Sequence, residues 1–312
     1  MYYIIVNPVA GRGRTMSRLP ALEEMFKSHG AAYQVHVTEK FPDGYEATKK
    51  FCADENCTGI IGMGGDGTFQ EIAAGMVDAF PQKTKIPIPL GIFPAGSGND
   101  FIMTVEGGKK QALAKYKKDT PTLAKNFFDV IKGGKTRAVD VITANGTAFL
   151  NIGCMGLDAR ITRNAVELKP KYGRHGYLAA VYKSIAQHKN LPLIVEVNGK
   201  KLDKPFTLAA ICNGQYYGGG LHIAPPAKID DGKITLCLID EISRIKLMTL
   251  FPSLMFSKHG VMREVTFIEC EEVAITIPSD VGTETLCLDG NLYPREGRLE
   301  FKILPKILDV FV

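Results

Sequence analysis

The 312-residue sequence lacks the features of a membrane-spanning, disulfide-bonded or zinc-binding protein. Its apolar stretches are too short for a transmembrane helix of about 20 residues, and the opening MYYIIVNPVAG has no basic region typical of a signal peptide. The seven cysteines include no C-x-x-C pair and the six histidines lie far apart, which predicts reduced core thiols and no zinc site. We therefore expect a cytoplasmic globular protein.

Two further absences exclude one kind of nucleotide site and one group of folds. No glycine loop contains G-K-[ST], which excludes a Walker A nucleotide site. No segment is low-complexity, and none repeats with a period of roughly 20 to 50 residues, which argues against solenoids and propellers. The chain has 45% hydrophobic residues, enough for a large core, and its length is typical of two domains.

Positive charge is concentrated in two segments. Residues 107–137 carry +7 and residues 160–190 carry +6, so the remainder of the chain, whose total is +5, carries −8. Such segments suit an anionic surface, either lipid headgroups or nucleic acid. The alternative is a solvated lysine-rich face without a partner.

The first 135 residues alternate between apolar runs and helical patterns, which predicts an α/β domain with a largely parallel sheet. The runs YYIIV, YQVHV, TGIIGM and PLGIF are the expected strands. A helix behind the third run is expected to be capped by Thr68. A later helix is expected to have Thr120 as N-cap, Pro121 as first residue and Gly133 as its stop.

After about Arg137 the pattern changes to alternating strands joined by tight turns, which predicts an antiparallel sandwich or barrel. VITA-NG-TAFL and IVEV-NG-KKL are predicted hairpins, because Asn and Gly tolerate the positive φ of a type I′ turn. Helical patterns interrupt the strands near residues 176–188 and 243–258.

Three glycine loops, NPVAGRGR, GGDGT and PAGSGND, each follow an expected parallel strand. All three would emerge at the carboxyl edge of the sheet, where ligands bind, and amides at a helix N-terminus attract anions. Arg12 and Arg14 are suited to terminal phosphates, and Ser97 to donating a hydrogen bond to one. Asp66 and Asp100 are suited to holding water around Mg²⁺. The alternative for Asp66 is the cap of a turn.

Gly62, Gly64 and Gly67 also satisfy the dinucleotide pattern G-x-G-x-x-G. This match is weak, because it follows the third strand and has no acidic ribose partner about 20 residues later. Asp66 would moreover repel a pyrophosphate unless a cation accompanied it.

These loops, followed by a β-rich region with IDDGK and a late LDG, resemble the diacylglycerol kinase catalytic family of soluble bacterial lipid kinases, related to sphingosine and ceramide kinases. The resemblance covers nearly the whole chain. It implies a nucleotide-binding α/β domain like those of phosphofructokinase and NAD kinase (1–137) and a β-sandwich lipid-substrate domain (138–312), with the nucleotide cleft between them. It also implies that ATP contacts Asn7, Pro8, Val9, Ala10, Gly11, Thr38, Gly64, Gly65, Asp66, Gly67, Thr68, Phe69, Gln70 and Ser97.

The resemblance further implies a structural Mg²⁺ bound by Asp231 and the main-chain carbonyls of Lys228 and Lys233. Oxygen ligands suit this hard cation, although DDG also fits an ordinary hairpin turn. Asp140, an acid amid apolar residues, resembles the family's acid near the active site; alternatively it faces water from a strand.

The sequence departs from the family at CLDGN, where D-G-E is usual and the glutamate is assigned as proton acceptor. Asn291 cannot accept a proton. Asp289 is therefore the predicted base, alone or within a network of aspartate, water and magnesium, and Asp66 is predicted to organise metal-bound water.

Together these features predict an ATP- and Mg²⁺-dependent lipid kinase, most simply converting diacylglycerol to phosphatidic acid. We expect peripheral contact with an anionic membrane through the two basic segments, no nucleic-acid partner and a possible homodimer. Two alternatives stay open: an NAD kinase-like enzyme, and a nucleotide- or lipid-binding pseudokinase suggested by Asn291.

Overall fold

The computed structural model describes residues 1–82, 84–172, 175–248, 260 and 262–312. The N-terminal part alternates strands and helices, as predicted. Its elements are β1 (Tyr2–Val6), a 3₁₀ turn (Ala10–Arg12), α1 (Arg14–Ser28), β2 (Tyr33–Val37), α2 (Asp43–Cys52), β3 (Gly59–Gly64), α3 (Asp66–Ala79), β4 (Leu90–Pro94), α4 (Asp100–Val105), α5 (Lys109–Tyr116) and α6 (Thr120–Gly133).

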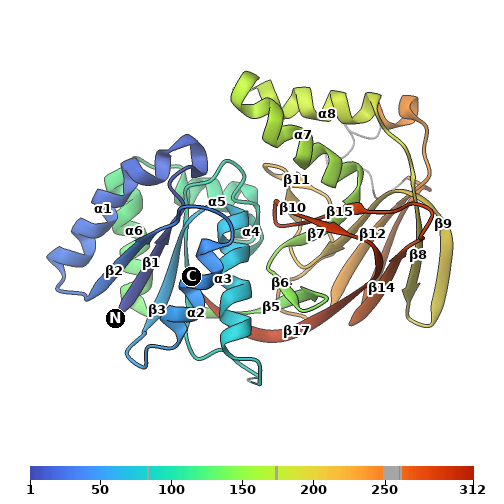
Figure 1. Cartoon of the computed structure of the whole chain (residues 1–312). Coiled ribbons are helices and arrows are strands. Elements are labelled where there is room, and N and C mark those ends of the chain that lie inside the picture. The colour runs from blue at the N-terminus through green and yellow to red at the C-terminus, as the bar shows by residue number, and fades with distance from the viewer. Residues whose placement is uncertain (83, 173–174, 249–259, 261) are drawn as a thin grey trace.

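The first four strands are parallel and lie in the order β2–β1–β3–β4. Alternate side chains of a strand point to opposite faces of a sheet. Ile4 and Val6 accordingly pack under α1 and α6, whereas Tyr3 and Ile5 pack under α2 and α3. The carboxyl ends of all four strands meet at one edge, on the upper side of the molecule in Figure 1.

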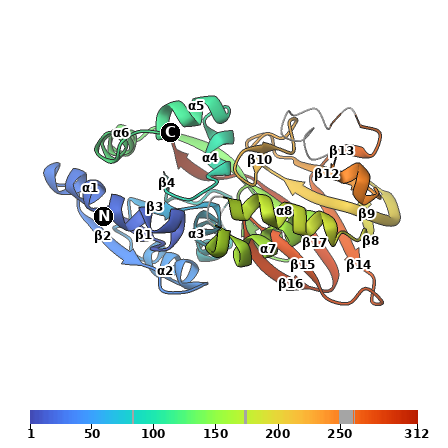
Figure 2. The ribbon, with the colours of Figure 1, turned by 90° about the horizontal axis from the view of Figure 1, so that it is seen from above.

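The C-terminal part is rich in antiparallel strands. Its elements are β5 (Thr136–Ala144), β6 (Thr147–Phe149), β7 (Ile152–Gly156), α7 (Leu157–Tyr172), α8 (Gly176–Ala186), β8 (Leu191–Val197), β9 (Lys200–Cys212), β10 (Tyr216–Tyr217), β11 (Leu221–His222), β12 (Ile234–Asp240), β13 (Val265–Cys270), β14 (Glu272–Ile277), β15 (Glu284–Leu288), β16 (Asn291–Arg295) and β17 (Gly297–Phe311). Helices α7 and α8 pack on each other above these strands, and Figure 2 shows them nearest the viewer.

Both predicted Asn-Gly hairpins are confirmed. Asn145 and Gly146 turn from β5 into β6 with φ of 46° and 86°, and Asn198 and Gly199 turn from β8 into β9 with φ of 49° and 72°. Of the helix expected over 243–258, residues 244–248 are helical and 249–258 lie outside the described residues. Among the described residues, no helix is both long and apolar enough to cross a bilayer.

Two predicted details of α6 are wrong. Asp119, not Thr120, is the N-cap, and its side chain accepts a hydrogen bond from the Thr122 amide at 3.0 Å. A carboxylate one residue earlier reaches the third amide of the helix, as N-cap side chains do. The stop is Gly134 in the left-handed region, φ 65°, one residue after Gly133.

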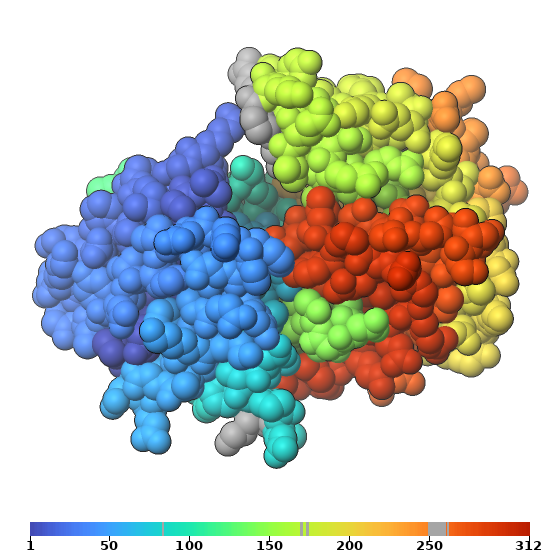
Figure 3. All heavy atoms as spheres, viewed as in Figure 1, coloured from blue at the N-terminus to red at the C-terminus, as the bar shows by residue number. Residues whose placement is uncertain are grey.

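The long strand β17 joins the two parts of the chain. Its first half pairs with β14 and β5, and its last residues pair with the start of β5 and, through Val310 opposite Leu90, run parallel to β4. One 15-stranded sheet therefore runs through the whole molecule. Figure 3 shows the β5–β6 hairpin, in green, wedged between the N-terminal elements and the red C-terminal strands.

Candidate active site

The three glycine loops interlock at the carboxyl edge of the parallel strands. The amides of Ala95 and Gly96 both donate to the carbonyl of Gly64, at 2.9 and 2.7 Å. A Cβ on Gly96 would lie 2.5 Å from the Cα of Gly65, and a Cβ on Gly11 would lie 2.0 Å from the Ala95 carbonyl oxygen. Glycine is therefore required for the loops to approach this closely.

Side chains also hold the loops together. Asn7 Nδ2 donates to Thr68 Oγ1 at 3.1 Å. The N-cap of α3 is Gly65 and Thr68 is the third residue of the helix, so the prediction that Thr68 caps it is wrong. The Arg14 guanidinium donates to the carbonyls of Gly11, at 2.9 Å, and Gly96, at 3.1 Å. Arg14, expected on a phosphate, thus ties the first loop to the third.

Asp66 and Asp100 lie together beneath the loops. Asp66 Oδ1 accepts a hydrogen bond from the Phe101 amide at 3.0 Å, so the first residue of α3 holds the start of α4. Burial raises the pKa of Asp66, against the opposing effect of backbone hydrogen bonds. Burial and then the negative charge of Asp66 raise the pKa of Asp100 to about 7.

Asp100 is held from the other half of the molecule, by residues that were not predicted. The amides of Gly219 and Gly220, between β10 and β11, donate to its oxygens at 2.6 to 3.1 Å. Both glycines have positive φ, which turns their amides toward the carboxylate. The only sequence signal was the run of three glycines at 218–220.

Asp289 reaches the same region from the turn between β15 and β16. Its two oxygens accept hydrogen bonds from the amides of Leu150, Asn151 and Ile152, at 2.7 to 3.2 Å. Burial and, to a smaller extent, the negative charge of Asp66 raise its pKa to about 7. The predicted base is thus close enough to Asp66 to interact with it.

Asn291 lies directly on the GGDGT loop. Its Nδ2 donates to the Gly67 carbonyl at 2.9 Å and to Gln70 Oε1 at 2.7 Å. The same Gln70 oxygen accepts from the Tyr293 hydroxyl at 3.1 Å, and Gln70 Nε2 donates to the Ala148 carbonyl at 2.8 Å. Where the family usually carries a proton acceptor, this chain has an amide donor that joins the two halves.

The comparisons with known proteins identify the family of this chain. Residues 1–144 match the diacylglycerol kinase catalytic domain, and residues 152–312, more than half of the chain, match the YegS C-terminal NAD kinase beta sandwich-like domain. The chain belongs to the diacylglycerol kinase catalytic family. It is a lipid kinase, with the α/β and β-sandwich-like parts predicted from the sequence.

Relatives of this kinase include proteins named diacylglycerol kinase. One, from Mycobacterium tuberculosis, is 26% identical over 88% of this chain and 84% of its own length; another, from Staphylococcus aureus, is 25% identical over 99% and 91%. Two solved structures from Bacillus anthracis str. Sterne, one described as a diacylglycerol kinase, share the fold. Their TM-scores are 0.74 and 0.65 at 22% and 19% identity, each covering 99% of this chain and 96% of the other.

The kinase brings together only part of the predicted ATP contacts. Asn7–Gly11, the stretch 64–68 and Ser97 lie in the three interlocked loops, and the amide of Thr38 beside them donates a hydrogen bond to the Val6 carbonyl at 2.8 Å. The side chain of Phe69 instead lies in the hydrophobic core, and that of Gln70 is occupied between the two halves. Phe69 can therefore offer a nucleotide only its backbone, whereas Gln70 also lines a cavity described below.

The predicted metal site at residues 228–233 contains a turn that the side chain of Asp231 stabilises. Asp231 is exposed, and its Oδ1 accepts from the Lys233 amide at 3.0 Å. Among the described residues, no three His, Cys, Asp or Glu side chains are grouped to hold a metal ion. Asp140 is fully buried and accepts from the amides of Gly232 and Lys306, both at 2.7 Å, so it does not face water.

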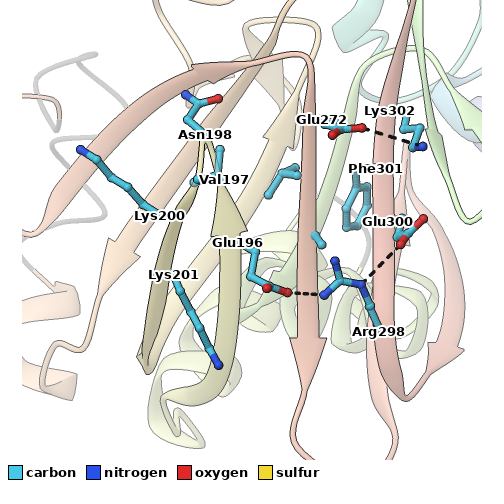
Figure 4. A pocket seen from close by; sticks show the side chains of 13 residues that line it. Glu196, Val197, Asn198, Lys200, Lys201, Glu272, Arg298, Glu300, Phe301 and Lys302 are labelled. Carbon is cyan, nitrogen blue, oxygen red and sulfur yellow. Dashed lines mark hydrogen bonds and ion pairs between the residues drawn. The ribbon is translucent and has the colours of Figure 1, made fainter.

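Two cavities open elsewhere on the kinase. One, of about 400 Å³, lies on the sheet of β8, β14 and β17. Figure 4 shows that several of its charged side chains pair with each other, Arg298 with Glu196 and Glu300, and Lys302 with Glu272. The other, of about 450 Å³, lies between α2, α3, the β5–β6 hairpin and β16, and its lining residues include Phe41, Gln70, Glu71 and Tyr293.

Proposed function

We propose that this lipid kinase uses ATP with Mg²⁺ to phosphorylate the hydroxyl of a membrane lipid, most simply diacylglycerol to phosphatidic acid. The observation that carries the proposal is the meeting of three glycine loops with Asp66 and Asp289 at one site. Phosphoryl transfer asks a protein mainly for positioning and for stabilisation of charge, which such a site can supply. Relatives named diacylglycerol kinase support the same acceptor.

The donor set fits a magnesium ion. Asp66 and Asp100 are close enough for the charge of one to raise the pKa of the other, so a divalent cation between them would be stabilising. When bound, the ion would neutralise phosphate charge. A second Mg²⁺ at Asp231 with the carbonyls of Lys228 and Lys233 stays a prediction.

We assign the nucleoside to the cavity of about 450 Å³, a volume suited to such a ligand. The cavity begins at Gln70, directly after the loop that would hold the phosphates, and at Phe41, three residues after Thr38. The Phe41 and Tyr293 rings, 5.9 Å apart and edge to face, form an aromatic wall for a base.

We assign proton transfer to Asp289. Its pKa of about 7 lies near the working pH of a general base, and it stands within electrostatic range of Asp66. The acceptor hydroxyl would enter between these two carboxylates. Peripheral membrane contact and a homodimer are not required by this scheme.

The test is transfer of labelled phosphate from ATP across a panel of diacylglycerol, ceramide, sphingosine and NAD, with and without Mg²⁺. We expect phosphatidic acid as the main product, formed only with Mg²⁺. Phosphorylation of NAD alone would replace the proposal with the NAD kinase alternative. ATP binding without transfer to any acceptor would favour a pseudokinase, the candidate that the donor role of Asn291 supports.

A further inference from the structure

The short hairpin of β10 and β11 is separate from the main sheet. It forms a two-stranded sheet of its own, in which Tyr216 pairs with His222 and Tyr217 with Leu221. Its turn is the glycine run 218–220, where all three residues have positive φ, between 61° and 97°. An isolated two-stranded hairpin is marginally stable, and glycine loses more conformational freedom on folding than any other residue. The conformation of this hairpin therefore depends on its contacts with the rest of the protein.

Helix α4 holds one side of the hairpin. The amides of Gly219 and Gly220 donate to Asp100, the first residue of α4. One helical turn later, Thr104 Oγ1 accepts from the amide of Gln215, just before β10, at 3.0 Å. Residues four apart lie on the same face of a helix, and Figure 2 shows β10 beside α4. The hairpin and Asp100 are therefore fixed to each other.

The other side of the hairpin is connected to the proposed base. Asn151 Nδ2 donates to the carbonyl of Tyr216 at 2.8 Å. The backbone amide of the same asparagine donates to Asp289 at 3.1 and 3.2 Å. Asp289 is thus connected to β10 through one residue, while Asp100 contacts the glycine turn directly. The hairpin stands between the two carboxylates.

The orientation of Asp100 also decides how it faces Asp66. A Cβ on Gly98 would lie 2.6 Å from Asp100 Oδ2 and 3.2 Å from Asp66 Oδ2, so both carboxylates are directed at the same point. A misplacement of about 1 Å at a reacting centre can cost about 10²-fold in rate. Contacts that fix the glycine turn therefore also fix the geometry of these two acids.

A pair of side chains outside the active site holds the beginning of the glycine turn. The Tyr217 hydroxyl donates to Oδ1 of Asp158 at 2.8 Å, and Asp158, in the first turn of α7, is 5% exposed. Burial, and then the charge of Asp158, raises the pKa of Tyr217, so its hydroxyl stays protonated and remains a donor. Because Tyr217 directly precedes Gly218, this hydrogen bond ties the turn to α7.

We propose that Asp158 and Tyr217 are positioning residues for phosphoryl transfer, which act through the glycine turn 218–220 on Asp100. Without their hydrogen bond the turn would populate other conformations, and Asp100 would lose the two amides that orient it. That this orientation serves phosphoryl transfer rests on the proposed function. The coupling of the pair to the turn does not.

Steady-state kinetics provide the first test. Tyr217→Phe keeps the ring and should lower kcat about tenfold, because the loss of one hydrogen bond shifts a conformational equilibrium by up to about that factor. The KM for ATP should stay within twofold of the parent, since the glycine loops are unchanged. Asp158→Leu should have the same effect. The double variant should be no slower than the slower single one, because both residues act through one bond. Additive losses would overturn the proposal.

Two variants serve as controls. Tyr3→Phe also removes a buried hydroxyl that donates to an aspartate, Asp54, but it lies on β1. It should lower the melting temperature as Tyr217→Phe does and leave kcat unchanged. Asp158→Asn can still accept from Tyr217 and should keep kcat within about twofold. If Tyr217→Phe is less stable but equally fast, the pair is merely structural and the proposal fails. A raised KM for the lipid alone would mean that the hairpin binds substrate, which also overturns it.

Hydrogen exchange tests the coupling without any activity. In Tyr217→Phe the segment 216–222 should exchange faster, because Asp100 no longer holds the amides of Gly219 and Gly220, while β9 should be unchanged. In Tyr3→Phe this segment should exchange as in the parent. Unchanged exchange in Tyr217→Phe would overturn the coupling. Faster exchange in this variant, with no lipid phosphorylated by the parent, would support the coupling and refute the proposed function.

Discussion

At the scale of single residues, Asp289 and Asn291 make different contacts on either side of Gly290. Asp289 keeps a carboxylate beside Asp66, whereas Asn291 donates to the GGDGT loop and to Gln70. The proposed proton acceptor and a link between the two halves therefore stand two residues apart. Substitutions at the two positions should have different effects.

We expect Asp289→Asn to reduce turnover by about 10² to 10⁴, the usual range for a general base, and Asn291→Ala to reduce it less. Because Asp289 holds three backbone amides, the substitution also costs about 1 to 3 kcal/mol of stability. The pH profile separates the two effects. Wild-type kcat/KM should rise as Asp289 ionises near pH 7, and this limb should be missing in Asp289→Asn. A variant with the limb intact would assign the base elsewhere.

Asn291→Glu should not restore a faster enzyme. Its carboxylate would face two acceptors, the Gly67 carbonyl and Gln70 Oε1, that now accept from Asn291. Turnover measured with the best lipid of the panel should stay within a few-fold of the parent, and the melting temperature should fall. A silent parent that this substitution switches on would be a pseudokinase.

The buried carboxyl group of Asp158 should make the stability of the protein depend on pH. It is 5% exposed, Oδ1 accepts from the Tyr217 hydroxyl at 2.8 Å, and Oδ2 has no hydrogen-bond partner. Burial raises its pKa from 3.8 to about 7, so the folded state binds a proton that the unfolded state releases near pH 4. Its stabilisation is complete below that pH and is lost as the pH rises through about 7.

Between pH 5 and 8 the wild type should therefore lose about 2 kcal/mol of unfolding free energy that Asp158→Asn does not lose. Denaturant unfolding at several pH values measures the difference. Asp231→Asn, at an exposed carboxylate, is the matched control and should follow the wild-type slope. Parallel curves for wild type and Asp158→Asn would mean that Asp158 is ionised in the folded state.

At the scale of elements, Asp66 connects two helices. From the sequence, a loop carboxylate serving metal-bound water could be removed with little effect on stability. In the structure it accepts from the amide of Phe101, so it caps α4 while it begins α3. Asp66→Ala should abolish turnover and also lower stability by about 1 kcal/mol, the usual value of a helix cap.

Asp66→Asn is the informative partner variant, because its amide oxygen can still accept the α4 hydrogen bond while its charge is gone. We expect a melting temperature near that of the parent and turnover near that of Asp66→Ala. Thermal melts with a phosphate-transfer assay measure both. Full activity in Asp66→Asn would remove the negative charge of Asp66 from the mechanism.

The elements that the sequence predicted well are those whose signals are local. Phe69, Ile72 and Met76 recur at helical spacing in α3 and are at most 1% exposed, and the Asn-Gly turns fix their hairpins. The cap of α6 was misplaced by one residue, because Asp119 and Thr120 are both good caps and only the backbone decides between them.

At the scale of the whole molecule, the sequence could not predict the contacts between distant segments. The glycine loops were predicted to converge, since each follows a parallel strand. No local pattern indicates that Gly219 and Gly220 hold Asp100, or that the Gln70 side chain contacts Asn291. Such pairings depend on how two halves dock, and polar side chains look alike in a sequence whether they bind a ligand or each other.

The pairing of the end of β17 with the N-terminal sheet is another contact between distant segments, and it has a testable consequence. The predicted division after residue 137 places β17 in the second domain, yet its last residues pair with β4 and with the start of β5. Leu308 and Val310 are fully buried and Phe311 is 6% exposed, all within the N-terminal core. A segment of one predicted domain thus completes the core of the other.

We therefore expect deletion of residues 308–312 to destabilise both parts together. Each of the three buried side chains contributes about 1.5 to 3 kcal/mol. Their sum is comparable with the whole unfolding free energy of a typical protein. Hydrogen exchange should show lost protection in β4 and β3 as well as in β5, whereas Lys302→Ala, an exposed position on the same strand, should leave all of them protected. If the truncated chain keeps β3 and β4 protected while β14 and β5 exchange freely, the N-terminal part folds on its own. The continuous sheet argues against this outcome. Without the end of β17, the edge of β4 would have no neighbouring strand to cover it.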